Sequence, residues 1–161
     1  MGTLNELGTA IMFKKAEASS RLALNLSVVE IERLRGHERT DEARLKALKA
    51  EIESDGMLIR PIVVDEETDV VLDGHHRLQA LRLLGCSRIP VCYVSYVSER
   101  IGVMSMVKGL EITKSKVVQA AMSGEPFPPK TTWHYLNSNP RTLNHISCIQ
   151  RRVDASLTDL L

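Results

Sequence analysis

A short apolar stretch that turns through Asp73-Gly74 straight into a helical pattern constrains the fold of this chain more than any other feature. Residues 70–72 are Val-Val-Leu, a strand pattern, and three leucines at 78, 81 and 84 fall on one helical face. Gly74 lets the backbone approach a ligand closely, and the start of the following helix gathers free N–H groups. This strand-to-helix turn therefore predicts a site for a phosphate or another anion.

Other patterns predict strands and helices on both sides of this turn. A strand at 58–64 and the strand at 70–72, joined by the polar residues 65–69, form a hairpin pattern. An amphipathic helix begins after Thr40, its predicted N-cap, and ends at Gly56. The remaining predicted elements are a short strand and turn from Leu22, a strand at 89–97, and a helix capped by Thr113 or Ser115 that ends near Gly124. The predicted fold class is α/β, or α+β in stricter usage.

The length of 161 residues fits one compact domain, or one domain with a modest appendage. We divide the chain into an N-terminal extension at 1–21, a core at 22–100 and a C-terminal segment at 101–161 that packs on the core. The part from 137 onward is polar and shows no clear period. We also expect no regular helix or central strand at 125–134, because its three prolines remove backbone donors.

Charge and hydropathy limit the classes of partner. Net charge is +1, from 21 basic and 20 acidic side chains, so the basic excess of a protein that neutralises DNA phosphates is absent. The apolar runs are strand-sized and the first residues lack a secretory pattern. We therefore expect a cytoplasmic protein with no nucleic-acid or membrane partner. The scattered Cys86, Cys92 and Cys148 are expected to be buried thiols.

Four of the five histidines lie in polar clusters: His37 beside Glu38, the pair His75-His76, and His134. His145 stands alone and is expected to be a solvated loop residue. Glu38 is a candidate general base for an attacking hydroxyl, with a solvated loop glutamate as the alternative. The clusters lie far apart in sequence, so a site built from them requires the fold to bring three segments together.

The residues of Asp73-Gly74-His75-His76-Arg77 suit a phosphate. Arg77 offers a planar fork of donors, and the two imidazoles could add further donors. Asp73 could hold magnesium or orient a neighbour. The alternative is an ordinary polar helix start with Asp73 as N-cap, which leaves His-His-Arg unexplained.

A third polar cluster, Lys130-Thr131-Thr132-Trp133-His134, follows the prolines. Its ammonium, two hydroxyls and imidazole could hold a small zwitterion and its carboxylate. The alternative is a surface turn with Trp133 packed on the core.

Together these motifs resemble the ParB/sulfiredoxin-like superfamily and, within it, the free serine kinases. Sulfiredoxins have a reactive cysteine where His75 stands, and partition proteins usually have Gly-Glu-Arg-Arg where this sequence has Gly-His-His-Arg. The resemblance implies a small mixed sheet with packed helices. It also implies a kinase that uses ATP or ADP with Mg²⁺ to convert L-serine to O-phospho-L-serine.

The resemblance implies a role for each motif. Glu38 is the catalytic base, and Asp73 is a catalytic residue that also holds the metal. The implied nucleotide site is Asp73, Gly74, His75, His76 and Arg77, and the implied serine site is His37, Lys130, Thr131, Thr132 and His134.

The sequence departs from the kinase pattern at three places. Gly36 stands where the family often has proline, Trp133 replaces an arginine, and 101–111 is a short link in place of a longer insertion. Two other functions stay open: a kinase for another small hydroxyl compound, and a non-enzymatic nucleotide- or DNA-binding module.

Overall fold

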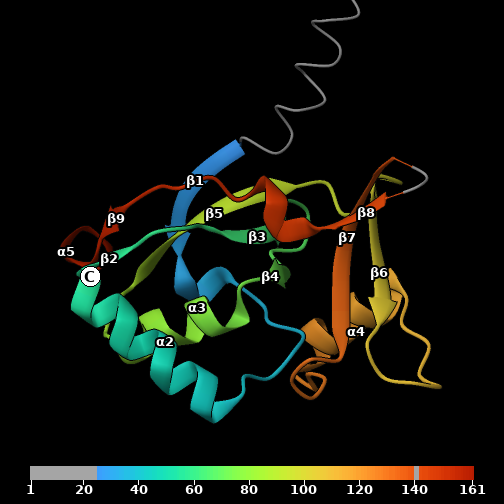
Figure 1. The fold of residues 1–161 in the computed structure, drawn as a ribbon, viewed down its shortest axis with the longest axis horizontal. Coiled ribbons are helices and arrows are strands. Elements are labelled where there is room, and N and C mark those ends of the chain that lie inside the picture. The colour runs from blue at the N-terminus through green and yellow to red at the C-terminus, as the bar shows by residue number, and fades with distance from the viewer. Residues whose placement is uncertain (1–24, 140–141) are drawn as a thin grey trace, which may run out of the picture.

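The computed structural model of the protein describes residues 25–139 and 142–161. The expected extension at 1–21 and the start of the first strand, from Leu22, lie outside the described residues. The described residues form two larger sheets and one two-stranded sheet, with helices packed against them (Figure 1). This confirms the predicted mixed fold of strands and helices.

The first sheet has the strand order β1-β5-β3-β4, with β1 at Asn25–Glu30, β3 at Ile62–Asp65, β4 at Val71–Asp73 and β5 at Arg88–Val94. β3 runs parallel to β5, and the β1–β5 and β3–β4 pairs are antiparallel. The sheet is therefore mixed, as the resemblance implied. The predicted hairpin between the strands now labelled β3 and β4 is present.

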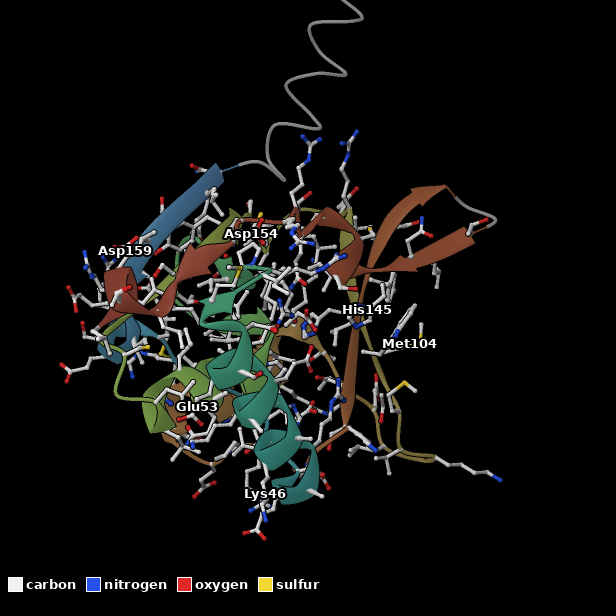
Figure 2. All side chains as sticks on the ribbon, turned by 60° about the vertical axis from the view of Figure 1, so that its left-hand side comes forward. Lys46, Glu53, Met104, His145, Asp154 and Asp159 are labelled. Atoms are coloured by element: carbon white, nitrogen blue, oxygen red, sulfur yellow. The ribbon has the colours of Figure 1, made fainter. Side chains whose placement is uncertain are left out.

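Two helices cover one face of this sheet, α2 at Glu42–Asp55 and α3 at His75–Leu83 (Figure 1). Ile62 and Val64 of β3 point into the core beneath them, whereas Val63 points into a second core on the opposite face. This alternation follows from the two-residue period of a strand. The outer face of α2 carries exposed charged residues such as Lys46 and Glu53 (Figure 2).

The second sheet closes the opposite core. It has the order β6-β7-β8, all antiparallel, with β6 at Ile101–Ser105, β7 at Thr132–Asn139 and β8 at Thr142–His145. Helix α4, at Lys114–Ser123, connects β6 to β7 and buries Val117 and Ala121. The same core contains Val63 of the first sheet, so the two sheets share an apolar interior.

The end of the chain returns to the first core. Strand β9 at Ala155–Ser156 pairs with β2 at Met57–Leu58, and α5 at Leu157–Leu160 follows. Leu160 is buried in the core under α2 and α3. The two short 3-10 helices are η2 at Ile31–Arg33 and η3 at Ile146–Ile149. The segment after 137, which shows no clear period in the sequence, is therefore organised by strand pairing.

The structure corrects several element boundaries. The N-cap of α2 is Asp41, whose side chain accepts from the Arg44 N–H, not Thr40. The single strand predicted at 58–64 is two strands, because Pro61 lacks a backbone donor. The strand predicted at 89–97 is β5, which starts at Arg88 and ends at Val94. The predicted caps Gly56, Thr113 and Gly124 are confirmed.

Two predictions about the second half of the chain are wrong. The link at 101–111 contains strand β6, and 132–134 belong to β7, the middle strand of the second sheet. The last of these prolines is Pro129, and every residue from Thr132 to the end of β7 has a backbone N–H, so strand pairing can begin at Thr132. Cys86 and Cys92 are buried as expected, but Cys148 is exposed. No helix among the described residues is long and apolar enough to cross a membrane.

Candidate active site

The segment that carries His37 and Glu38 is fixed by backbone hydrogen bonds on both sides. The Val71 N–H donates to the Arg35 carbonyl at 2.9 Å, and the Phe127 N–H donates to the His37 carbonyl at 2.8 Å. One partner lies on strand β4, and the other belongs to the proline-rich segment before β7. Glu38 is therefore held between the strand that leads to the Asp73-Gly74 turn and the Lys-Thr-Thr motif.

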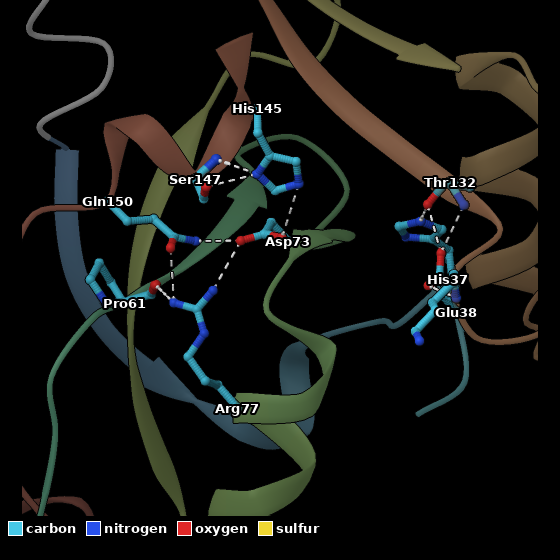
Figure 3. Close-up of polar contacts among 10 residues, drawn as sticks. His37, Glu38, Pro61, Asp73, Arg77, Thr132, His145, Ser147 and Gln150 are labelled. Carbon is cyan, nitrogen blue, oxygen red and sulfur yellow. Dashed lines mark hydrogen bonds and ion pairs between the residues drawn. The ribbon is translucent and has the colours of Figure 1, made fainter. Parts of the chain in front are cut away.

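The Glu38 carboxylate accepts three hydrogen bonds from the Lys-Thr-Thr motif (Figure 3). Oε1 accepts from the Lys130 N–H at 2.7 Å; Oε2 accepts from the Thr132 N–H at 3.1 Å and from the Thr132 hydroxyl at 2.8 Å. Lys130 has a φ of 60°, a left-handed conformation that is uncommon outside glycine. The exposed loop thus adopts a strained conformation that aims its N–H at the carboxylate.

His37 lies behind this carboxylate and is fully buried. Its Nδ1 donates to the Val71 carbonyl at 2.7 Å, and its Nε2 lies 2.9 Å from the Thr132 hydroxyl oxygen. Burial lowers the pKa of His37 to about 4, against the opposing effect of the Val71 hydrogen bond. His37 is therefore neutral near pH 7, with its proton on Nδ1.

His75 and His76 attach the start of α3 to the same segment. Nε2 of His75 accepts from the His37 N–H at 3.1 Å, and Nε2 of His76 accepts from the Asp41 N–H at 3.0 Å. Burial and the neighbouring histidines lower the pKa of His75 well below 6.5, and burial lowers that of His76. Each ring therefore uses one nitrogen as an acceptor, which leaves Nδ1–H as its single donor toward a phosphate.

His134 and Thr131 are more deeply buried than expected of side chains that contact a ligand. His134 is 2% exposed, and its Nε2 forms a 2.8 Å hydrogen bond with the Tyr96 hydroxyl. Thr131 is 1% exposed, and its hydroxyl donates to the Pro128 carbonyl at 2.7 Å. Of the motif, the Lys130 side chain and the Thr132 hydroxyl are the groups nearer the surface. The roles of His134 and Thr131 at a serine site stay predictions.

Asp73 and Arg77 form a second group of contacts (Figure 3). The Asp73 Oδ2 accepts from the Arg77 guanidinium at 2.9 Å and from the Gln150 amide at 2.7 Å. The guanidinium also donates to the Gln150 side-chain oxygen and the Pro61 carbonyl. Three of its five N–H groups are therefore directed at protein atoms, and two remain for a phosphate.

Sequence reasoning missed two members of this group. Gln150 is 4% exposed and bridges Asp73 and Arg77, although it lies in the segment without a clear period. His145, expected in a solvated loop, ends strand β8, and its Nε2 lies 3.9 Å from Oδ1 of Asp73. Its ring also packs against Trp133 at 5.6 Å between centroids. No local pattern marks either residue, because a tertiary return of the chain brings them to the site.

Gly74 connects the two groups at the start of α3. Its φ is 104°, and a Cβ there would lie 2.4 Å from the Ile62 side chain. No other residue type fits this position without displacing strand β3. No side chain caps the start of α3, and a helix start with free N–H groups is the arrangement that favours an anion.

Magnesium, which the resemblance implies, would find one carboxylate at this turn. Within residues 25–139 and 142–161, no group of three His, Cys, Asp or Glu side chains could hold a metal ion. Magnesium in nucleotide enzymes keeps several waters and binds one or two carboxylates together with phosphates. Oδ1 of Asp73 lies 3.9 Å from Nε2 of His145. These residues fit a magnesium ion that arrives with a nucleotide, with Asp73 as its protein ligand.

Residues 12–109 match the family model of the ParB N-terminal domain, which is more than half of the chain. The chain belongs to the ParB N-terminal domain family. This confirms the resemblance drawn from the strand–Asp-Gly–helix motif. The match includes the segments that carry Glu38 and the Asp73–Arg77 turn, and it ends before the Lys-Thr-Thr motif.

Curated proteins that are similar to this chain include several serine kinases and a ParB-like protein of Sulfolobus acidocaldarius. An ATP-dependent L-serine kinase of Desulfurococcus mucosus is 33% identical over 87 residues, which are 52% of this chain and 34% of that protein. The ATP-dependent L-serine kinase SbnI of Staphylococcus aureus is 34% identical over 70 residues, 42% of this chain and 28% of that protein. The ADP-dependent L-serine kinase SerK of Thermococcus kodakarensis is 24% identical over 95 residues, 56% of this chain and 39% of that protein. The chain thus matches about a third of the length of these kinases.

Solved structures support the fold over most of the chain. A free serine kinase in complex with AMP superposes with a TM-score of 0.68 at 16% identity, covering 84% of this chain and 93% of the other. A C-terminally truncated SbnI from Staphylococcus aureus gives a TM-score of 0.65 at 15% identity, covering 88% and 91%. At these identities the likeness establishes the fold. It extends well beyond the matched family domain, so the second sheet belongs to the shared architecture.

Proposed function

We propose that this protein is a kinase that transfers a phosphoryl group from ATP or ADP to the hydroxyl of L-serine, producing O-phospho-L-serine. One observation carries the proposal: Glu38 is held by two N–H groups and a hydroxyl of the Lys-Thr-Thr motif, within a segment that His75 and His76 attach to the start of α3. The serine kinases among its relatives support the choice of acceptor.

The nucleotide end of the proposed site is the turn from β4 into α3. The uncovered N–H groups after Gly74 receive the terminal phosphates, with the remaining donors of His75, His76 and Arg77 around them. Asp73 would hold a magnesium ion, which would supply positive charge beside the phosphates. Arg77 serves two purposes in this arrangement, since it also fixes Asp73.

The acceptor end lies between Glu38 and the Lys-Thr-Thr motif. The Lys130 ammonium is exposed and suits the serine carboxylate, and the Thr132 hydroxyl and His37 form the wall behind Glu38. Glu38 takes the proton of the serine hydroxyl, while the electron pair of that O–H bond attacks phosphorus and the nucleotide product leaves with the electron pair of the broken P–O bond. Oε2 of Glu38, which contacts the Thr132 hydroxyl, receives this proton as the Thr132 hydrogen turns away from it.

The proposal includes a cytoplasmic setting, with the product available for cysteine synthesis. A direct test incubates the purified protein with L-serine, magnesium and either ATP or ADP and measures phosphoserine by mass spectrometry. Glu38→Ala should abolish most of the product, and Glu67→Ala, an exposed glutamate in the β3–β4 turn, should not. Equal rates in the two variants would remove Glu38 as the base.

A kinase for another small hydroxyl compound is the second candidate, and Trp133 favours it. Its ring lies 5.7 Å from that of Tyr135 and 5.6 Å from that of His145, whose Nε2 is 3.9 Å from Asp73, so an aromatic ring stands near the Asp73 side of the site at a position where the resembled serine kinases carry an arginine. A competition panel of serine, threonine, homoserine and related alcohols separates the two. If the enzyme prefers a larger alcohol, that alcohol is the acceptor in place of serine, and the proposed phosphoryl transfer is otherwise unchanged.

A further inference from the structure

The Thr132 hydroxyl lies between two groups that both accept hydrogen bonds. Its oxygen is 2.8 Å from Oε2 of Glu38 and 2.9 Å from Nε2 of His37. A hydroxyl carries one hydrogen, so it can donate to one of the two at a time. When Glu38 is ionised and His37 is neutral, one of these short contacts has no hydrogen in it. One additional hydrogen would fill the contact that lacks one.

The Val71 carbonyl fixes which nitrogen of His37 faces Thr132 as an acceptor. A carbonyl oxygen can only accept, so the 2.7 Å contact requires a proton on Nδ1. Burial lowers the pKa of His37 to about 4, which keeps the ring neutral and leaves Nε2 with a lone pair. Strand β4 thereby sets the tautomer of the ring that contacts Thr132.

The ionisable groups around this unit do not supply a competing charge. His75 of α3 and His134 of β7 flank the His37 ring at centroid distances of 4.6 and 5.3 Å, and the pKa of each is lowered well below 6.5, chiefly by burial. Tyr96, beyond His134, has its pKa raised by burial and is neutral. Lys130 contacts Glu38 through its backbone N–H.

We propose that Glu38, Thr132 and His37 bind one proton as a single unit, in which protonated Glu38 donates through Oε2 to the Thr132 hydroxyl and that hydroxyl donates to Nε2 of His37. In this state every donor and acceptor of the unit is paired, whereas in the ionised state one contact lacks its hydrogen. Thr132 and His37 are then positioning residues that orient the proton on the base. The inference rests on the proposed function for its catalytic meaning, but the proton-binding unit itself does not.

The proton balance of the phosphoryl-transfer step follows from this arrangement. The substrate O–H bond breaks, its electron pair forms the new bond from the substrate oxygen to phosphorus, and its proton bonds to Oε2 of Glu38. The bond between that phosphorus and the bridging oxygen of the nucleotide breaks, and its electron pair leaves with ADP or AMP. The Thr132 hydrogen turns from Glu38 toward His37 as this happens, and no covalent bond of Thr132 or His37 is broken. The proton later leaves Glu38 for water, which restores the ionised state.

The nitrogen chemical shift of His37 tests the unit without any substrate. At pH 7, Glu38→Gln removes the negative charge that attracts the Thr132 hydroxyl hydrogen. The hydroxyl should then donate its hydrogen bond to Nε2 of His37, and the ¹⁵N resonance of Nε2 should shift toward the value of a protonated nitrogen. The same substitution should have this effect in a Thr132→Ser background, which retains the hydroxyl. In a Thr132→Val background, which is nearly isosteric but lacks the hydroxyl, Nε2 should not respond.

A response that persists with valine, or that is absent in the wild-type background, would overturn the proposal. Amide spectra away from β7 verify that each variant is folded, and Thr132→Ala serves as the second hydroxyl-free variant if valine disturbs the strand. These readings hold whichever substrate the enzyme uses.

An activity measurement separates failure of the unit from failure of the serine-kinase assignment. Thr132→Val should lower kcat by about tenfold to a hundredfold, as expected for the loss of a hydrogen bond to a charged group, and should change the acidic limb of the pH profile. Thr132→Ser should restore the wild-type profile. Phosphoserine formation without the nitrogen response rejects the unit alone, and the nitrogen response without phosphoserine rejects serine as the acceptor alone.

Discussion

Glu38 and Asp73 lie on two sides of the same strand-to-helix turn but are held by different kinds of partner. The donors to Glu38 are two backbone N–H groups and one hydroxyl, all neutral. The donors to Asp73 include the Arg77 guanidinium, with which it forms an ion pair at 2.9 Å. The Arg77 and Asp73 side chains are 18% and 21% exposed, so this pair is largely shielded from water.

The difference indicates a division of roles. Removing a carboxylate that is paired with a shielded guanidinium leaves that cation without its counter-charge, so Asp73 contributes to holding the chain together. Removing a carboxylate held by neutral donors leaves no cation unpaired. The structure therefore separates an acid tied to a cation from an acid held by neutral groups, and we propose the first as the metal ligand and the second as the base.

The largest expected effect is a loss of activity on substitution of Glu38, with little change in stability. Glu38→Gln retains the shape and one oxygen acceptor but removes the base, so the rate of phosphoserine formation should fall by about 10²–10⁴-fold. The melting temperature should change little, because the amide still accepts a backbone N–H. Mass spectrometry of phosphoserine and a thermal melt of the same sample measure both. A variant that unfolds instead would make Glu38 a structural residue.

Substitution of Asp73 is expected to lower stability. Asp73→Asn leaves the Arg77 guanidinium buried without its counter-charge, which should cost about 3 kcal/mol of unfolding free energy. The exposed pair Arg152–Asp154 provides the control, and Arg152→Ala should cost less than about 1 kcal/mol. Urea unfolding measures both. Equal costs would mean that the Asp73–Arg77 pair behaves as a surface pair.

The buried histidines predict a dependence of stability on pH. The pKa of His37 falls from 6.5 to about 4 on folding, so the unfolded state binds the proton first as pH decreases. Stability is therefore full above 6.5 and is lost between 6.5 and 4, by at most about 3 kcal/mol for this residue. Unfolding curves across this range measure the slope, and His37→Gln should make it shallower. An unchanged slope would show that His37 is not the titrating group.

The smallest expected effect concerns the turn between the two acids. Gly74→Ala places a Cβ 2.4 Å from Ile62 at a φ of 104°, whereas Gly85→Ala, at a φ of 79°, meets nothing within 4 Å. Both substitutions incur left-handed strain, and only the first adds a steric clash. Thermal melts should show Gly74→Ala to be the less stable of the two by about 1–2 kcal/mol. The opposite order would mean that β3 yields at this position.

The sequence was informative where local chemistry decides the structure. Asp73-Gly74 ends a strand and starts a helix by conformational preference alone, and Gly56 and Gly124 end helices in the same way. The Glu38 segment could be proposed as part of the site from its motif, and the structure joins it to the Lys-Thr-Thr motif through Lys130 and Thr132.

The parts that could not be predicted depend on the return of the chain. Gln150 and His145 reach Asp73 because Ile146, which lies between them in sequence, packs in the core that contains Val63 and Val70, and no local period reports such a contact. The burial of Thr131 and His134 was also hidden, since alternation along β7 decides which side chains face the core. Strand β6 escaped notice because its pairing with β7 depends on residues thirty positions away.

The most direct test of the account follows phosphoryl transfer itself, by ³¹P NMR of the protein with L-serine, magnesium and ATP or ADP. The account predicts a growing phosphomonoester signal of O-phospho-L-serine that depends on serine and is lost in Glu38→Gln. A nucleotide spectrum that stays unchanged with both donors, or a serine-dependent signal that grows equally fast in Glu38→Gln, would contradict it.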